Sequence, residues 1–308
     1  MNWQKLGRIF CPDGTMPWAR HSFMTPVPVL MSDDVIRLYG GMRDDDGISR
    51  IGWIDVDSRD PTRVLRICNA PALDIGAPGM FDDNGVILGD VIRMPDGGLR
   101  MYYVGFQIVK RAKFLAFTGL AISDSDGVRF DRVSTTPVLD RTPTGPFINA
   151  LHSIMPVEGG FRAWISCGRD WQYFDGQPYP KYDCWTVLSK DGVSFDTDNA
   201  LPIMGVNEDE YRIGRPRVNH LPDGSYELRV TSDSVSQQYA CFLAVSDDGI
   251  NFIRTTAEEL PRGAVDAWDE QETCYPARID VPGVGSYLFY NGNGMGRTGV
   301  GVARWVER

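Results

Sequence analysis

Three short stretches share one pattern and decide the fold: residues 123–130 read SDSDGVRF, residues 189–195 read SKDGVSF and residues 246–252 read SDDGINF. Each stretch follows an apolar run and ends on a phenylalanine. An Asp-Gly pair between two such runs is typical of a β-hairpin, because glycine adopts positive φ and the aspartate side chain caps the turn. The pattern predicts three copies of a strand, a turn and another strand.

A second pattern sets the number of units. It is again a strand, a turn and a strand, and its copies are residues 27–41, 90–105, 153–168, 216–232 and 276–292. Five copies in 308 residues give roughly 60 residues per unit, which is too long for a solenoid repeat and suits a four-stranded propeller blade. We expect an all-β fold: a five-bladed β-propeller of four-stranded antiparallel blades, forming a single domain over residues 1–308.

The fifth unit ends after its third strand, within residues 299–308. Residues 3–10, WQKLGRIF, have strand character at the other end of the chain. We expect this amino-terminal strand to complete the fifth blade and close the ring, which removes an exposed sheet edge.

The acidic balance excludes two classes of partner. A formal net charge of -10 at pH 7 would repel nucleic acid and anionic membranes. Residues 1–10 lack the apolar core of a secretion signal, and no later stretch approaches the ~18 to 20 apolar residues of a membrane span. We therefore expect a cytoplasmic protein. Its six cysteines are scattered and form no Cys-x-x-Cys pair, which predicts buried free thiols.

Motifs for cofactors and metals lack their structural context. Residues 294–299 match Gly-x-Gly-x-x-Gly, yet strand-like residues follow and the chain ends nine residues later, so no dinucleotide fold fits. The acidic runs at 44–47 and 124–127 lack the distal Glu of a calcium loop. Three histidines without metal-ligand spacing argue against zinc. We expect neither a metal nor an organic cofactor.

The blade geometry selects candidate site residues. The first strand of a blade is innermost, and its start shares one face with the loop between the second and third strands. Alignment of the units brings residues 81–84, 208–211 and 268–271 into register at the start of inner strands, so carboxylates recur there. The candidate carboxylates on this face are Asp82, Asp83, Glu210, Glu270 and Glu272.

Basic and polar residues gather on the same face despite the acidic total. Arginine forms forked hydrogen bonds to carboxylate, sulfate or phosphate, so these residues are candidates for substrate binding. Pairing with neighbouring carboxylates is the alternative role for the arginines. The candidate binding residues are Arg20, His21, Arg43, Asp44, His152, Arg169, Arg212, Arg215, Asn293 and Arg297.

Residues 37–55, 81–105, 268–279 and 287–303, together with the three Ser-x-Asp-Gly turns, resemble the five-bladed propeller glycoside hydrolases, a group that includes families 43, 32, 117 and 130. The resemblance covers nearly the whole chain. It implies a glycosidase-like, carbohydrate-active enzyme that hydrolyses or transfers a glycosidic bond. Residues 268–279 and 287–303 are also similar to uncharacterised glycosidase-like proteins of bacterial polysaccharide biosynthesis.

Two carboxyl groups suffice for such chemistry. One stays protonated and donates to the leaving oxygen, and the other activates water or attacks the anomeric carbon. Asp82 with Asp83, and Glu270 with Glu272, are the pairs that we expect to act, with Glu210 as a further candidate. The expected partner is a small saccharide or sugar conjugate, and the arginines favour an anionic one such as a uronic acid or a nucleotide sugar.

Two departures from the family keep other functions open. Ala19-Arg20-His21 stands where hydrolases of the family 43 and 32 type carry an essential Asp, and residues 146–156 contain no carboxylate where family 43 carries its acid. Either the chemistry has moved to other blades, or the chain is a non-catalytic sugar or nucleotide-sugar binding protein. A glycoside phosphorylase is a further alternative.

Overall fold

The computed structural model describes residues 2–124, 126–234 and 239–306. Within them the chain is built of antiparallel β-strands, and the helix α1 (Asn293–Gly296) is one turn long. This confirms the predicted all-β class. The strands form groups of four, and the first two groups are β2 (His21–Ser32), β3 (Val35–Arg43), β4 (Ser49–Asp57) and β5 (Val64–Ile67), then β6 (Val86–Arg93), β7 (Leu99–Gln107), β8 (Leu115–Ser123) and β9 (Asp131–Arg132).

The remaining groups follow the same plan. A short parallel contact between β8 and β10 merges the second and third groups into one sheet. The third and fourth groups are β10 (Ile148–Val157), β11 (Gly160–Phe174), β12 (Gln177–Ser189) and β13 (Phe195–Met204), then β14 (Glu210–His220), β15 (Tyr226–Ser234), β16 (Ala240–Ser246) and β17 (Ile253–Glu258). The last group is β18 (Cys274–Val281), β19 (Gly285–Asn291), β20 (Val300–Val306) and β1 (Asn2–Phe10).

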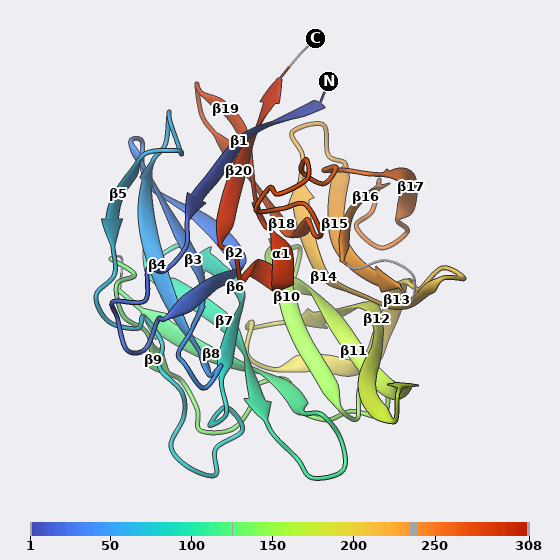
Figure 1. Cartoon of the computed structure of the whole chain (residues 1–308). Helices are drawn as coiled ribbons and strands as arrows, with labels where there is room; N and C mark the ends of the chain where they lie inside the picture. The colour runs from blue at the N-terminus through green and yellow to red at the C-terminus, as the bar shows by residue number, and fades with distance from the viewer. Residues whose placement is uncertain (1, 125, 235–238, 307–308) are drawn as a thin grey trace.

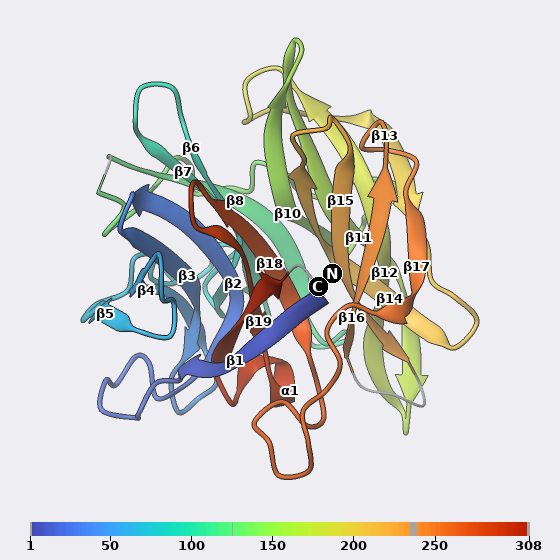
Figure 2. The same ribbon diagram turned by 90° about the horizontal axis from the view of Figure 1, so that it is seen from above.

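The groups surround the centre of the molecule in chain order (Figure 1). The first strands of successive groups contact one another, β2 with β6, β6 with β10, β10 with β14 and β14 with β18, and β18 contacts β2 again. β1 pairs antiparallel with β20, from Asn2 opposite Val306 to Phe10 opposite Val300. Asn2 and Val306 therefore lie side by side, near the N and C labels of Figure 2. No sheet among the described residues closes on itself.

The three predicted turns each attach one group to its neighbour. Gly127, Gly192 and Gly249 adopt φ of 60°, 73° and 72°, the conformation that the Asp-Gly pattern requires. The carbonyl oxygen of Gly127 accepts a hydrogen bond of 2.7 Å from the Tyr39 hydroxyl on β3. Gly192 accepts one of 2.8 Å from Tyr102, and Gly249 accepts one of 2.9 Å from the Trp164 indole. The repeated turn is therefore an inter-group contact as well as a hairpin.

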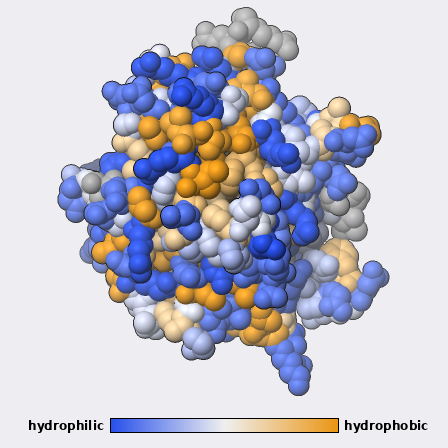
Figure 3. All heavy atoms as spheres, turned by 60° about the vertical axis from the view of Figure 1, so that its left-hand side comes forward, coloured by the Kyte–Doolittle hydropathy of each residue, from blue (hydrophilic) through white to orange (hydrophobic). Residues whose placement is uncertain are grey.

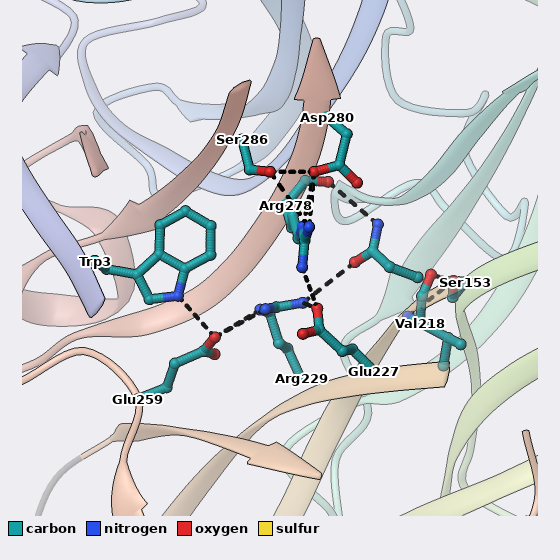
Figure 4. A network of polar contacts seen from close by, with 10 residues as sticks. Trp3, Ser153, Val218, Glu227, Arg229, Glu259, Arg278, Asp280 and Ser286 are labelled. Carbon is teal, nitrogen blue, oxygen red and sulfur yellow. Dashed lines mark hydrogen bonds and ion pairs between the residues drawn. The ribbon is translucent and has the colours of Figure 1, made fainter. Parts of the chain in front are cut away.

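A buried polar network joins the fourth group to the fifth (Figure 4). Arg229 on β15 is 1% exposed and pairs with Glu227 and with Glu259, over 2.9 Å each. Glu259 also accepts a hydrogen bond of 3.0 Å from the Trp3 indole on β1, and Glu227 pairs with Arg278 on β18 over 2.6 Å. The network thus ties the amino-terminal strand β1 to β15 in the fourth group and to β18 in its own group.

Most of the apolar core lies between the sheets. Strand β3 reads VIRLYGGMR and is buried along almost its whole length, as expected for a β-branched and aromatic strand covered on both faces. The face drawn in Figure 3 is mostly hydrophilic, with hydrophobic residues gathered near its middle. Within the described residues, no helix has the length and apolar character needed to cross a membrane.

Candidate functional site

A cavity of about 730 Å³ lies where the first strands of all five groups meet. Its wall includes Thr25 on β2, Ile87 on β6, His152 on β10, Arg215 on β14 and Tyr275 on β18. Loops between second and third strands complete the wall. This is the face on which the sequence places the candidate residues.

β-bulges aim four of these side chains into the cavity. The ladder register shifts at Thr25, His152, Arg215 and Tyr275, each on the first strand of its group. Thr25, Arg215 and Tyr275 have φ of 55° to 56°, and each is followed by proline. Non-glycine residues rarely adopt positive φ, and such strain concentrates at functional sites, where bulges redirect side chains.

Two carboxylates line the cavity among the described residues, Asp233 and Glu272. Glu272 is 6% exposed, and its Oε2 accepts the Met295 N–H over 2.6 Å. Burial raises the pKa of Glu272, and the nearby charge of Asp233 raises it further. Asp233 forms an ion pair with Arg212, which donates to it from Nε over 3.1 Å and from Nη2 over 2.6 Å. The Tyr211 hydroxyl donates to the same oxygen. The two carboxyl groups therefore occupy contrasting environments.

Cations outnumber carboxylates in the cavity wall. Burial lowers the pKa of Arg43 and brings the pKa of Arg215 to about 10. Burial and the charge of Arg212 lower the pKa of Lys113. The charged residues among the described lining are Arg43, Lys113, Arg212, Arg215, Asp233 and Glu272.

Aromatic rings form much of the remaining wall. Arg212 lies 4.9 to 5.6 Å from the ring centres of Tyr182, Tyr211 and Tyr239. Arg215 lies 5.1 Å from the ring of Tyr275. Tyrosine presents an apolar face and a polar edge, a combination that suits a sugar ring with its C–H and hydroxyl groups.

Five of the residues predicted from the sequence line this cavity: Arg43, His152, Arg212, Arg215 and Glu272. His152 is buried, and burial together with Arg215 and Arg217 places its pKa well below the usual value. Asn293 lies behind the wall, where its Oδ1 accepts the N–H groups of Gln271 and Glu272 over 2.8 and 3.1 Å. Asn293 thereby positions the Glu272 backbone.

The recurring acidic segments have a structural role that the sequence interpretation missed. Asp82 is fully buried and pairs with Arg132 on β9 over 2.7 Å. Glu210 pairs with Arg254 on β17 over 2.6 Å, and Asp269 pairs with Lys5 on β1 over 2.6 Å. In each case a carboxylate at the start of the inner strand, or in the turn just before it, pairs with a cation on the outermost strand of the same group. None of these three carboxylates lines the cavity.

Burial opposes ionisation of Glu210, yet hydrogen bonds from Arg254 and the Asn207 backbone hold its pKa below the usual value. Asp83 and Glu270 serve local turns instead. Asp83 accepts the Gly79 N–H over 2.8 Å, and Glu270 accepts the Asp266 N–H over 2.5 Å. Neither contributes to the cavity wall.

The other candidate binding residues also lie outside the wall. Arg20 pairs with Asp45 over 3.1 Å, and Arg169 pairs with Asp183 over 2.7 Å. Asp44 pairs with Arg50 and accepts backbone N–H groups of its own loop. His21 contacts the Ser22 hydroxyl over 2.7 Å, and Arg297 is exposed.

Asp233 and the tyrosines were not among the predicted site residues. Asp233 lies near the end of β15, at the loop between second and third strands, which the blade geometry already assigns to the cavity face. A proline inside a strand-like run is a signal of a bulge, and the pairs Thr25-Pro26, Arg215-Pro216 and Tyr275-Pro276 carry it. That signal points to three of the bulge residues. In the part of the chain that the structure describes, no group of three or more His, Cys, Asp or Glu side chains could hold a metal ion.

Comparisons with solved structures confirm the fold resemblance. A structure described as "Glycoside hydrolase" superposes with a TM-score of 0.73 at 16% identity, over 99% of this chain and 94% of that one. A second, described as "The GH130 family of mannoside phosphorylases contains glycoside hydrolases that target beta-1,2 mannosidic linkages in Candida mannan", has a TM-score of 0.69 at 14% identity, over 99% and 93% of the two chains. At these identities the likeness shows the fold. It is the fold of glycoside hydrolase-like proteins.

Sequence comparison identifies a much nearer relative. No family model matches the chain. "Uncharacterized protein Rv1502" of Mycobacterium tuberculosis strain ATCC 25618 / H37Rv is 32% identical over 303 residues, which cover 98% of this chain and 99% of that protein. The two chains therefore correspond over nearly their whole length. At this identity and coverage, the chain belongs to the same family as the uncharacterised protein Rv1502 of Mycobacterium tuberculosis.

Proposed function

We propose that the protein is a carbohydrate-active enzyme that cleaves or transfers a glycosidic bond in the central cavity. The observation that carries the proposal is the pair Glu272 and Asp233, a carboxyl group whose pKa is raised by burial beside a carboxylate held by Arg212. Glycosidic bond cleavage needs one acid that stays protonated and one carboxylate that stays ionised. The fold likeness to glycoside hydrolases supports the same reaction class.

Each carboxyl group has one role in the proposed reaction. Glu272 donates its proton to the leaving glycosidic oxygen as the bond to the anomeric carbon breaks. The contacts from Arg212 and Tyr211 engage Oδ2 of Asp233, and we assign the reaction to Oδ1. That oxygen takes a proton from an attacking water or forms the glycosyl bond itself. The separation of the two carboxyl groups, about 5 Å for retention or 6.5 to 9.5 Å for inversion, decides between these routes.

The proposed architecture is a five-bladed propeller with its ring closed by the amino-terminal strand. Two observations support it: the cyclic contacts of the five first strands and the pairing of β1 with β20. A central cavity at one end of the inner strands is the expected position for a propeller active site.

We also propose a cytoplasmic location. All six cysteines are free thiols, and five of them are buried. Free thiols are usual in a reducing compartment, where disulfides rarely persist.

Saccharide binding without catalysis is the second candidate. It is favoured by Ala19-Arg20-His21 at the start of the first group, where related hydrolases are expected to carry an essential Asp. A product screen separates the candidates. Purified protein is incubated with a panel of neutral and acidic oligosaccharides, with and without inorganic phosphate, and products are identified by mass spectrometry. Release of a shortened saccharide supports the enzyme, and its dependence on phosphate identifies a phosphorylase. Binding of a saccharide with no product after prolonged incubation contradicts the enzymatic proposal.

A further inference from the structure

Buried polar atoms without hydrogen-bond partners concentrate in the cavity wall. Burying such an atom without a partner is costly, so nearly all are satisfied in folded proteins by protein, water or ligand. In the described part of the chain, ten buried side-chain polar atoms have no partner, and six belong to residues of this wall. The six atoms are Thr25 Oγ1, Arg43 Nε, Ser49 Oγ, His152 Nδ1, Arg215 Nε and Arg215 Nη1.

Arg215 is the centre of this group. Its guanidinium donates from Nη2 to the Leu88 carbonyl over 3.0 Å, and Nε and Nη1 have no protein acceptor. The residue is 8% exposed. Its backbone is held at φ 56° in a bulge, with its N–H donating to the Ser166 hydroxyl over 3.1 Å. A buried cation without a carboxylate partner is strongly unfavourable, so the fold maintains an arginine that an anion would stabilise.

The charge of the cavity has the sign that such an anion requires. Arg212 is committed to Asp233 by their ion pair. The charged side chains of the wall outside this ion pair are three cations, Arg43, Lys113 and Arg215, and one carboxyl group, Glu272. This positive interior lies within a chain of net charge -10. A concave site of one charge sign concentrates ligands of the opposite sign.

His152 adds a directional polar group beside Arg215. The two residues occupy equivalent bulges on β10 and β14, and the charge of Arg215 acts on the imidazole. His152 Nδ1 has no hydrogen-bond partner within the described chain. A neutral imidazole contributes one donor and one acceptor, so it distinguishes the orientation of a bound group without adding charge.

We propose that Arg215, with Arg43 and His152, forms a subsite for an oxyanion carried by the saccharide, a carboxylate or a phosphoryl group. The inference rests on the proposed function in taking the ligand to be a saccharide, and it names the substrate class as acidic sugars. The guanidinium groups bind the anion, and the Thr25 and Ser49 hydroxyl groups hydrogen-bond to its oxygens or to the adjacent sugar hydroxyls.

The test measures binding in the Glu272→Gln variant, so that turnover plays no part in the result. The probes are the methyl glycosides of glucuronic and galacturonic acid, their neutral glucose and galactose counterparts, and inorganic phosphate. Affinities are measured by isothermal titration calorimetry. We expect at least one uronide to bind about tenfold or more tightly than its neutral counterpart, the scale of a charge-assisted hydrogen bond. Equal affinities within both sugar pairs, with no binding of phosphate, overturn the proposal.

Variants locate the binding site. Arg215→Met and Arg43→Met should each abolish the preference for the anionic probe, and Arg215→Lys should retain part of it, because lysine keeps the charge and loses the directional N–H groups. Arg129→Met is the matched control, since Arg129 is exposed and outside the cavity. A preference that survives in both methionine variants overturns the proposal. Competition between phosphate and uronide supports the subsite, and Arg215-dependent binding of phosphate with no preference for either uronide overturns the assignment of the oxyanion to the saccharide.

Discussion

Arg212 donates from Nε and from Nη2 to one oxygen of Asp233, over 3.1 and 2.6 Å. The ion pair is 11% to 12% exposed and lies in the cavity wall. It holds a negative charge in a fixed position, and that charge acts on the carboxyl group of Glu272. Arg212 and the burial of Glu272 together place the two carboxyl groups in contrasting environments.

The raised pKa of Glu272 has a consequence for stability. A carboxyl group with a higher pKa in the folded state stabilises the fold fully below its unfolded pKa, and that contribution is lost as pH rises through the folded pKa. We expect the free energy of unfolding of the wild type to fall relative to that of Glu272→Gln as the pH rises from about 4, the usual pKa of a glutamate, through the raised pKa of Glu272. Urea denaturation of both proteins across this range measures it. A pH-independent difference would show that the carboxyl group of Glu272 is not perturbed by the fold.

Asp82 tests the structural role of the recurring carboxylates. Asp82→Asn leaves Arg132 without its charge partner, and breaking a buried ion pair costs about 3 kcal/mol. We expect that loss in the free energy of unfolding, with saccharide binding by the folded protein within about twofold of wild type, because the residue lies outside the cavity wall. Denaturant titration and calorimetry measure the two quantities. Loss of saccharide binding by Asp82→Asn, with an unchanged free energy of unfolding, would show instead that Asp82 acts in the saccharide site.

The sequence predicted the all-β class and its repeated turns because both depend on local chemistry that repeats. Asp-Gly turns need glycine at positive φ wherever they occur, and Gly127, Gly192 and Gly249 all show it. The recurring carboxylates were harder to interpret. A residue type that recurs at the same place in several groups indicates that this place has similar surroundings in each group. Both a central site and an ion pair within each group would produce such a recurrence. Only the position of Arg132, which follows Asp82 by 50 residues, distinguishes the two, and no spacing rule gives that contact.

The network of Figure 4 should contribute to global stability. Arg229→Met removes the buried cation that two carboxylates share, the partly buried Glu227 and Glu259. We expect a loss of about 3 to 5 kcal/mol in the free energy of unfolding, the usual result of removing one member of a buried pair. A second variant, Arg229→Met with Glu259→Gln, should recover part of the loss. Equal stability of wild type and Arg229→Met would show that the network is energetically neutral.

The cysteines should differ in reactivity. Cys11 is partly exposed, and the other five are buried. Burial raises the pKa of Cys11 and raises that of Cys68 to about 11, and only thiolates react rapidly with disulfide reagents. We expect slow labelling of one thiol in the native protein and labelling of all six after unfolding. Rapid labelling of several thiols under native conditions would contradict the buried placement of the other five.

The cavity could be predicted only in part. Glu272 and Arg215 were identified from blade geometry, since both lie near the start of an inner strand. Blade geometry also places Asp233 on this face, at the loop between second and third strands. It was not chosen as a candidate, because its contact with Arg212 and the burial of Glu272 are products of packing. Three of the bulges were easier to predict, because a residue-proline pair within a strand already implies an irregular ladder of backbone hydrogen bonds.

The most direct measurement of the central claim is the turnover of four proteins on a substrate found in the product screen. Glu272→Gln and Asp233→Asn each remove one reacting group. Glu158→Gln is the control, since Glu158 is an exposed turn residue. Glu270→Gln tests the alternative assignment that the sequence favoured.

Loss of an acid or a base lowers turnover by about 10²-fold or more. We predict that loss for Glu272→Gln and for Asp233→Asn, with Glu270→Gln and Glu158→Gln close to wild type. Wild-type turnover by Glu272→Gln or Asp233→Asn, or a loss confined to Glu270→Gln, would contradict the assignment of the reaction to Glu272 and Asp233.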